Sequence, residues 1–376
     1  MSSAGRPMSG GMSFRLLIAA LALSGCVARG ELSFSTIDAP GSVYRQVHVV
    51  TSRAPVVPGF FGIERAFEPT FARYEVSIPA NHVVGQVDLP RSSVDADPHL
   101  HFVTKQWSAY GSSSAWETGV RQEMLDLPRG QRELVIFVHG FNNTFAEGLY
   151  RAAQLAEDYR LSGVMAHFSW PSAANPLTYA YDRDSVLFSR DSFREMLYSA
   201  TRVGAERVLV VAHSMGSLLT MEALSAMSKQ RPGWVARNIS AVVLMSPDID
   251  PDIFQTQARG IGAFPEEFIV FSSQRDRALA LSARLTGQSE RLGNVQDIEG
   301  ISEFPITFID TTNLSKGSGH TTALDSPTLI SLLAQSREVN ASLDEARANR
   351  TGLLPGTVLT VQNATEIILA PGGRVR

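Results

Sequence analysis

The sequence predicts an α/β fold, a three-layer sandwich in which a mostly parallel central sheet lies between two layers of helices. From residue 131 onward, short apolar runs alternate with longer amphipathic runs, which is the pattern of successive β–α units. These apolar runs are hydrophobic at nearly every position, as in strands that are buried on both faces. Before residue 131, apolar and polar residues alternate within the strand-like runs, so antiparallel strands are expected to precede the parallel ones.

The spacing of apolar residues places each element. The first strands are expected at 43–52 and 73–78, and a helix at 114–127 follows them. In that helix Trp116, Val120 and Met124 recur every four residues. The later strands are predicted at 133–138, 164–169, 206–212, 239–245, 268–272 and 306–309. The later helices are predicted at about 144–161, 178–202, 215–229 and 327–337. Two short β-like runs, 357–361 and 366–369, have no predicted place in the sheet.

Length and composition limit the possible functions. With 376 residues, of which 44% are hydrophobic, the chain can bury a large core. The net charge is −4, and no dense block of Lys or Arg is present, so nucleic acid is not an expected partner. The sequence contains neither a metal-ligand cluster nor a nucleotide-binding glycine loop. No metal and no cofactor are therefore expected.

The N-terminus has the pattern of a secretory signal. Arg15 precedes the apolar run 16–23, which is too short for a membrane-spanning helix of about 20 residues. The sequence 23–26, Leu-Ser-Gly-Cys, resembles the bacterial lipobox, which implies cleavage after residue 25 and a lipid on Cys26. Because Val27 is not the retention residue Asp, the resemblance favours the outer membrane, facing the periplasm. The alternatives are an ordinary signal peptide with a chance cysteine, or an uncleaved anchor.

Cleavage of the signal would also set the chemistry and the charge of the mature chain. Cys26 is the only cysteine, so the mature domain has no disulfide and no thiol nucleophile. Removal of the signal peptide takes away two arginines and no acid, which changes the net charge from −4 to −6. The predicted regions are a signal peptide (1–25), a tether (26–42), one domain (43–340) and a C-terminal extension (341–376). Within the domain, 43–130 supplies the N-terminal strands and helix, and 131–340 is the catalytic core.

A candidate nucleophile stands where a strand turns sharply into a helix. Residues 212–216 read Ala-His-Ser-Met-Gly, and small residues two before and two after Ser214 allow the backbones to approach closely. Ala212 departs from the glycine that is usual at its position, so its methyl group must fit beside the turn. The backbone N–H of Met215, at the start of the helix, could stabilise an oxyanion formed next to Ser214.

A second oxyanion donor is expected at the end of the strand 133–138. There the chain reads His-Gly-Phe-Asn-Asn over 139–143, which resembles the oxyanion loop of α/β-hydrolases. This resemblance implies that the backbone N–H of Phe141 is the donor. His139 is interpreted as a buried turn histidine bonded to the backbone, without a catalytic role.

The serine hydroxyl needs an imidazole base, and the base needs a carboxylate to orient it. α/β-Hydrolases supply these groups in the chain order serine, acid, histidine. Of the eight histidines, only His320 follows Ser214. The predicted acid is Asp276, just after the strand 268–272. Asp248 and Asp250, after the preceding strand, are the reserve candidates, and their alternative role is to cap a short helix near Ile253.

Over residues 43–340 the chain resembles the α/β-hydrolase superfamily, in particular its bacterial, esterase-like lipoproteins of unknown function. The features that carry the resemblance are His139-Gly140-Phe141-Asn142, Phe168-Ser169-Trp170-Pro171, Ala212-His213-Ser214-Met215-Gly216, Ser246-Pro247-Asp248, Asp276 and Gly319-His320. The resemblance implies a serine hydrolase that cleaves carboxylic esters, of a small molecule or a lipid, through an acyl-enzyme. An amidase, peptidase or acyltransferase would use the same residues, and a non-catalytic envelope scaffold is the remaining alternative.

The surroundings of the predicted site are expected to be simple. Only about twenty residues separate Met245 from Phe268, too few for a large helical cap, so the site is expected to be fairly open. Trp170, Tyr179 and Tyr181 either line the substrate pocket or pack in the core.

Overall fold

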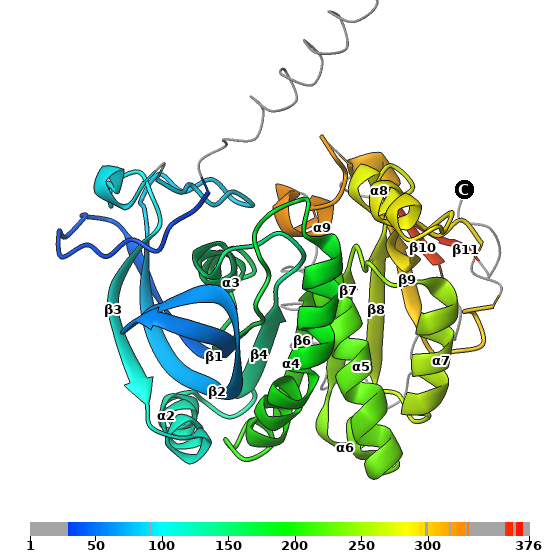
Figure 1. The fold of residues 1–376 in the computed structure, drawn as a ribbon, viewed down its shortest axis with the longest axis horizontal. Helices are drawn as coiled ribbons and strands as arrows, with labels where there is room; N and C mark the ends of the chain where they lie inside the picture. The colour runs from blue at the N-terminus through cyan, green and yellow to red at the C-terminus, as the bar shows by residue number, and fades with distance from the viewer. Residues whose placement is uncertain are drawn as a thin grey trace, which may run out of the picture.

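A mixed sheet runs through the protein in the computed structural model, which describes residues 29–90, 92–297, 300–315, 317–327, 329–330, 358–363 and 366–370 (Figure 1). Within these residues the sheet has 11 strands, in the order β11-β10-β9-β8-β7-β6-β4-β5-β1-β2-β3. Neighbours are parallel from β10 to β1, whereas the pairs β1–β2, β2–β3 and β10–β11 are antiparallel. The strands are β1 (Val43–Val57), β2 (Phe60–Ile78), β3 (Val103–Tyr110), β4 (Glu133–Val138), β5 (Val164–Ser169), β6 (Arg207–His213), β7 (Ala241–Met245), β8 (Glu267–Ser272), β9 (Thr307–Asp310), β10 (Val358–Asn363) and β11 (Glu366–Ala370).

Helices cover both faces of the sheet. One layer holds α2, α4, α5, α6 and α7, of which α4, α5 and α7 lie side by side (Figure 1). α3 and α9 pack on the other face, and α8 follows the carboxyl end of β8. The helices are α2 (Ser113–Asp126), α3 (Phe145–Asp158), α4 (Tyr179–Ala200), α5 (Met215–Gln230), α6 (Trp234–Asn238), α7 (Pro251–Ile261), α8 (Arg277–Leu285) and α9 (Thr322–Asp325). The predicted three-layer sandwich, with a mostly parallel sheet and antiparallel N-terminal strands, is confirmed.

Two separate cores explain why the strands are apolar throughout. In β4, Leu134, Ile136 and Val138 pack against the layer that contains α5, while Val135 and Phe137 pack against α3. Alternate side chains of a strand point to opposite faces, so a strand between two helical layers needs apolar residues at every position.

The N-terminal part of the sheet is larger than predicted. β1 and β2 extend beyond their predicted ends into a long hairpin that closes at Val57 and Phe60. β3 was not predicted, because Lys105, Gln106 and Ser108 interrupt its apolar residues and only two of its eight residues are buried. β1 also runs parallel to β5, which joins the hairpin to the central sheet.

The segment expected to be a tether instead packs on the domain from Arg29 onward. Leu32, Ser33 and Ala39 are buried, and the Ser33 amide donates to the hydroxyl of Tyr150 on α3 at 3.1 Å. The backbone of this stretch also pairs with β3, because the amide of Thr104 donates to the carbonyl of Ser33 at 2.8 Å and the amide of Ser35 donates to the carbonyl of Thr104 at 3.0 Å.

Several predicted features lie outside the described residues. These are the signal peptide (1–25), Cys26, the predicted helix at 327–337 beyond Ile330, and most of the C-terminal extension. The two short β-like runs near the C-terminus form β10 and β11, and β10 pairs with β9. In the described part of the chain, no helix has both the length and the apolar character needed to cross a membrane.

Candidate active site

The turn at Ser214 has the geometry that the sequence predicts. Ser214 connects β6 directly to α5 and has φ 52° and ψ −121°, a strained conformation for a residue with a side chain. Its amide donates to the carbonyl of Met245 on β7 at 2.9 Å, which holds the strained residue in place. At Gly216, a Cβ atom would lie 2.4 Å from the carbonyl oxygen of His139, so a larger residue could not fit. The methyl group of Ala212 is accommodated in the core beneath α5.

Asp276 and His320 are joined by a hydrogen bond of 2.8 Å between Oδ2 and Nδ1. Asp276 is buried, and its other oxygen accepts from the amide of Leu279 at 3.0 Å, so the carboxylate also caps α8. With Nδ1 engaged by the acid, Nε2 is the ring nitrogen that remains to exchange a proton with a serine.

His320 lies at the same edge of the sheet as the serine turn. Its ring centroid is 4.8 Å from that of His213, the residue directly before Ser214. The carbonyl oxygen of His320 is 3.3 Å from Nε2 of His213. Burial, followed by the neighbouring His320, holds the pKa of His213 well below its ordinary value, so His213 is neutral. The structure thus joins the predicted histidine to the predicted acid, and places them beside His213, the residue that precedes the predicted serine.

The two reserve aspartates have other partners. Asp250 caps α7, because its Oδ1 accepts from the amides of Asp252 and Ile253 at 2.9 and 3.2 Å. The capping role considered for this group is therefore the one that Asp250 has.

Asp248 belongs to a buried cluster beneath the serine turn. Its carboxylate lies 3.1 Å from Nε of Arg291 and accepts from the hydroxyls of Ser282 at 2.8 Å and Tyr179 at 2.9 Å. The Asp248 amide donates to the carbonyl of Ser214 at 3.1 Å. Asp248 thus supports the backbone of the turn, while its charge is balanced by the arginine.

The two predicted oxyanion donors make no hydrogen bond within the described residues. This holds for the backbone N–H of Phe141 and for that of Met215. Next to Phe141, Asn142 has φ 58°, so the loop makes a tight turn at this point. The ring of Phe141 packs edge-on against Tyr179, with centroids 5.4 Å apart.

A buried arginine on β1 supports this loop, and sequence reasoning did not identify it. Arg53 is 1% exposed and donates to the carbonyls of Asn143 at 2.9 Å and Ser172 at 3.0 Å, and to Oγ of Ser169 at 3.0 Å. Burial lowers the pKa of its guanidinium to about 10, which still leaves it charged at neutral pH.

A buried aspartate on α4 completes the support. Asp182 accepts from the amide of Asn142 at 3.4 Å, from the amide of Ala173 at 2.8 Å and from the hydroxyl of Ser172 at 2.5 Å. Burial raises its pKa above the ordinary value, and Arg53 is the cation that opposes this shift. A charged residue in a strand or helix normally faces solvent, so only the burial of this pair indicates its role.

The predicted nucleophile lies below the surface, although the connection after β7 holds only the short helix α7. Ser214 is 2% exposed. His139 is buried between the carbonyls of Gly140 at 2.9 Å and Trp170 at 3.0 Å, and burial lowers its pKa well below the ordinary value. Trp170 is likewise a core residue.

Of the two tyrosines that follow, Tyr179 contacts the site and Tyr181 does not. Tyr181 donates to the carbonyl of Ile63 and lies beneath Arg65. In the part of the chain that the structure describes, no three His, Cys, Asp or Glu side chains form a cluster suited to a metal ion.

The sheet, its two helical layers and the serine turn are those of the α/β-hydrolase superfamily. The model of a family described as "Alpha/beta hydrolase of unknown function (DUF900)" matches residues 116–337, more than half of the chain. The chain therefore belongs to this family.

Solved structures resemble the chain at low identity. TT1662 from Thermus thermophilus has 13% identity and a TM-score of 0.36, and the match covers 57% of this chain and 91% of that one. An extracellular α/β-hydrolase from a Paenibacillus species has 12% identity and a TM-score of 0.25, with 58% and 99% covered. That protein is described as sharing structural and functional homology with tobacco salicylic acid binding protein 2. No curated protein matches the chain.

Proposed function

We propose that the protein is a serine hydrolase that cleaves carboxylic esters, with Ser214 as nucleophile, His320 as base and Asp276 as the orienting acid. The observation that carries this proposal is the 2.8 Å bond between His320 and a buried Asp276, at the sheet edge where Ser214 occupies its strained turn. A histidine bound in this way has a fixed tautomer and a stabilised cation, which is the requirement for activating a serine hydroxyl.

The reaction would proceed in two displacements. Oγ of Ser214 attacks the ester carbonyl while Nε2 of His320 takes its proton, and the amides of Phe141 and Met215 bind the oxyanion. The bond to the leaving alkoxide breaks as His320 returns the proton to it, which releases the alcohol and leaves an acyl-enzyme. Water then attacks the acyl group, His320 accepts its proton and passes it to Ser214, and the acid is released.

The location is part of the same proposal. A signal peptide over 1–25 and a lipid on Cys26 would anchor the enzyme in the bacterial envelope, at the outer membrane facing the periplasm. Such an enzyme would meet esters of small molecules or lipids in that compartment. The triad leaves the leaving group and the acceptor open, so an amide or a second alcohol could replace the ester or the water.

An active-site probe tests the proposal directly. We expect a fluorophosphonate to label the wild-type protein, and the protein to hydrolyse p-nitrophenyl esters of short to long chains. Ser214→Ala should lose both properties, whereas Ser228→Ala, which removes another buried serine hydroxyl of α5, should keep both. Absence of labelling in the folded wild type would contradict the proposal and favour a non-catalytic scaffold. Labelling without ester turnover would favour an amidase or acyltransferase.

A further inference from the structure

We infer that α8 docks the protein on an anionic phospholipid surface, with the active-site edge facing the membrane, so that its substrates are esters held in that membrane. The inference deepens the proposed function. The claim that the substrate comes from the membrane depends on the proposed hydrolase activity and on the proposed lipid at Cys26. The docking face rests on the surface of α8 itself.

The first observation is where the N-terminal segment joins the domain. Arg29 donates to Oδ1 of Asn142 at 2.9 Å and also to its backbone carbonyl, and it forms an ion pair with Glu147 at 2.7 Å. Asn142 is next to Phe141, the proposed oxyanion donor. Cys26 precedes Arg29 by three residues, and three residues span at most about 11 Å. A lipid on Cys26 would therefore keep the oxyanion loop close to the membrane surface.

The second observation is the exposed face of α8. Arg277, Leu281, Arg284 and Leu285 are exposed, and their spacing places them on one side of the helix. Leu281 is 57% and Leu285 is 61% exposed, although each is a large apolar side chain. Leucines between arginines on one exposed helical face are typical of helices that lie in a membrane interface.

The third observation ties α8 to the catalytic residues. The helix begins directly after Asp276, which caps it, and the amide of Arg277 donates to the carbonyl of Ser318 in the loop that carries His320. A surface that binds α8 therefore lies beside the acid and the base. Arg29 contacts the loop after β4 and α8 follows β8, and these strands belong to the parallel part of the sheet, so both lie at its carboxyl edge.

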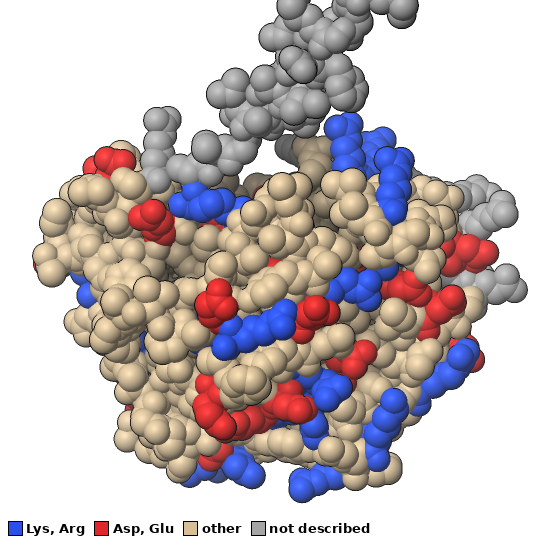
Figure 2. All heavy atoms as spheres, viewed as in Figure 1, with Lys and Arg blue, Asp and Glu red and all other residues tan. Residues whose placement is uncertain are grey.

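The charge of the exposed face of α8 favours an anionic membrane as its partner. Arg275, Arg277 and Arg284 are exposed, and α8 contains no acidic residue. Basic side chains gather over α8 at the top of Figure 2, whereas basic and acidic side chains intermingle over the lower part of the same view. Because the mature chain would carry a net charge of −6, most of its surface gains little from an anionic membrane, and the basic edge is the one that is attracted.

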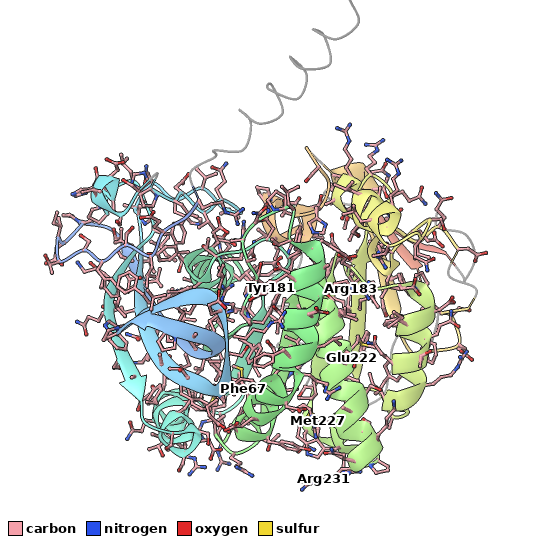
Figure 3. All side chains as sticks on the ribbon, viewed as in Figure 1. Phe67, Tyr181, Arg183, Glu222, Met227 and Arg231 are labelled. Atoms are coloured by element: carbon pink, nitrogen blue, oxygen red, sulfur yellow. The ribbon has the colours of Figure 1, made fainter. Side chains whose placement is uncertain are left out.

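A lipid-borne quencher tests the orientation. The full-length protein is purified from membranes and reconstituted in phosphatidylglycerol/phosphatidylethanolamine vesicles that contain doxyl-labelled phospholipid. A thiol-reactive fluorophore is placed at Leu281→Cys, and Cys26, the only native cysteine, is blocked by its lipid. The matched control is Phe67→Cys, which is 88% exposed on β2 and lies low in the view of Figure 3, away from α8.

Quenching at position 281 should exceed that at position 67 by roughly threefold or more. The difference should shrink when Arg277→Gln and Arg284→Gln are added, or when the vesicles are made of phosphatidylcholine alone. Equal quenching at both positions, or no quenching at position 281, would overturn the inference. So would a difference that the two arginine substitutions leave unchanged. In each case the basic face would be assigned to a soluble anionic partner.

The hydrolase and the docking face can fail separately. The quenching pattern should persist in Ser214→Ala, which removes only the proposed nucleophile. With an active serine, the ratio of turnover on a vesicle-embedded ester to turnover on a soluble ester should fall roughly tenfold in Arg277→Gln/Arg284→Gln. Quenching without any ester turnover would contradict the proposed hydrolase and support the docking face. Ester turnover without quenching, and with the same vesicle-to-soluble ratio in wild type and double variant, would support the hydrolase and contradict the docking face.

Discussion

Three aspartates follow neighbouring strands of the sheet, and each has a different set of partners. Asp250 caps α7, Asp248 is paired with Arg291 beneath the serine turn, and Asp276 binds His320 while capping α8. A carboxylate has two oxygens, so Asp276 can hold its helix with one and the imidazole with the other. The hydrogen-bond partners, which depend on side chains far apart in the chain, therefore decide which aspartate can serve as the acid.

Asp276→Asn should separate these two roles. Its remaining carbonyl oxygen can still cap α8, but the amide cannot stabilise an imidazolium, so we expect kcat to fall by about 10³-fold or more with little change in thermal stability. Asp250→Ala should lower the free energy of unfolding by about 1 kcal/mol through loss of the cap and leave kcat nearly unchanged. Ester kinetics and thermal unfolding of both variants check this. If Asp248→Asn lost activity while Asp276→Asn remained active, the acid of the triad would be Asp248 and not Asp276.

At the scale of elements, the position of the proposed oxyanion loop depends on how β1 and α4 pack against the end of β4. Arg53 from β1 and Asp182 from α4 meet at this loop and bind its backbone through Asn143 and Asn142. The two side chains bond to the loop, and their opposite charges interact electrostatically. Loss of one charge would leave the other buried and uncompensated. The pair therefore acts as a positioning device for the loop.

Asp182→Asn should reveal that positioning role. An amide in place of the carboxylate keeps the volume but can accept fewer of the three hydrogen bonds, so the Phe141 amide should lose its alignment. We expect kcat to fall roughly 10- to 100-fold with KM nearly unchanged, because an oxyanion donor acts on the transition state. Asp184→Asn, an exposed substitution on the same helix, is the matched control. A rise in KM at constant kcat would argue against positioning.

At the scale of the whole molecule, three of the buried histidines, His139, His167 and His213, have lowered pKa values and are neutral. Burial holds the pKa values of His139 and His213 well below the ordinary value and lowers that of His167 from 6.5 to about 3. Each pKa is lower in the folded state than in the unfolded chain, so below pH 6.5 the unfolded chain binds more protons. The stability these groups contribute is present above pH 6.5 and declines as the pH falls below it.

The free energy of unfolding should therefore decrease as the pH is lowered from 6.5 toward 4. One buried histidine contributes about 1.4 kcal/mol per pH unit within this window, so His167→Gln should reduce the slope by about that amount. His99→Gln, at an exposed position, should leave the slope unchanged. Urea unfolding at several pH values measures both slopes, and an unaltered slope in His167→Gln would contradict the assignment.

The sequence by itself determined the features that depend on neighbouring residues. The alternation of strands and helices, the sandwich and the serine turn follow from local apolar periodicity and from the small residues Ala212 and Gly216. The choice of His320 as candidate base needed only chain order, because no other histidine follows Ser214. Local patterns carry this information because backbone geometry is set by residues a few positions apart.

Only the tertiary structure decided which distant groups meet. In the structure Asp276 bonds to His320, and Asp248 forms an ion pair with Arg291. Arg53 and Asp182 are buried beside the proposed oxyanion loop. It also packed residues 29–42 on the domain, where a free tether was expected. These outcomes join residues 40 to more than 100 positions apart. Their energies depend on burial and on interatomic distances, which the periodicity of the sequence does not contain.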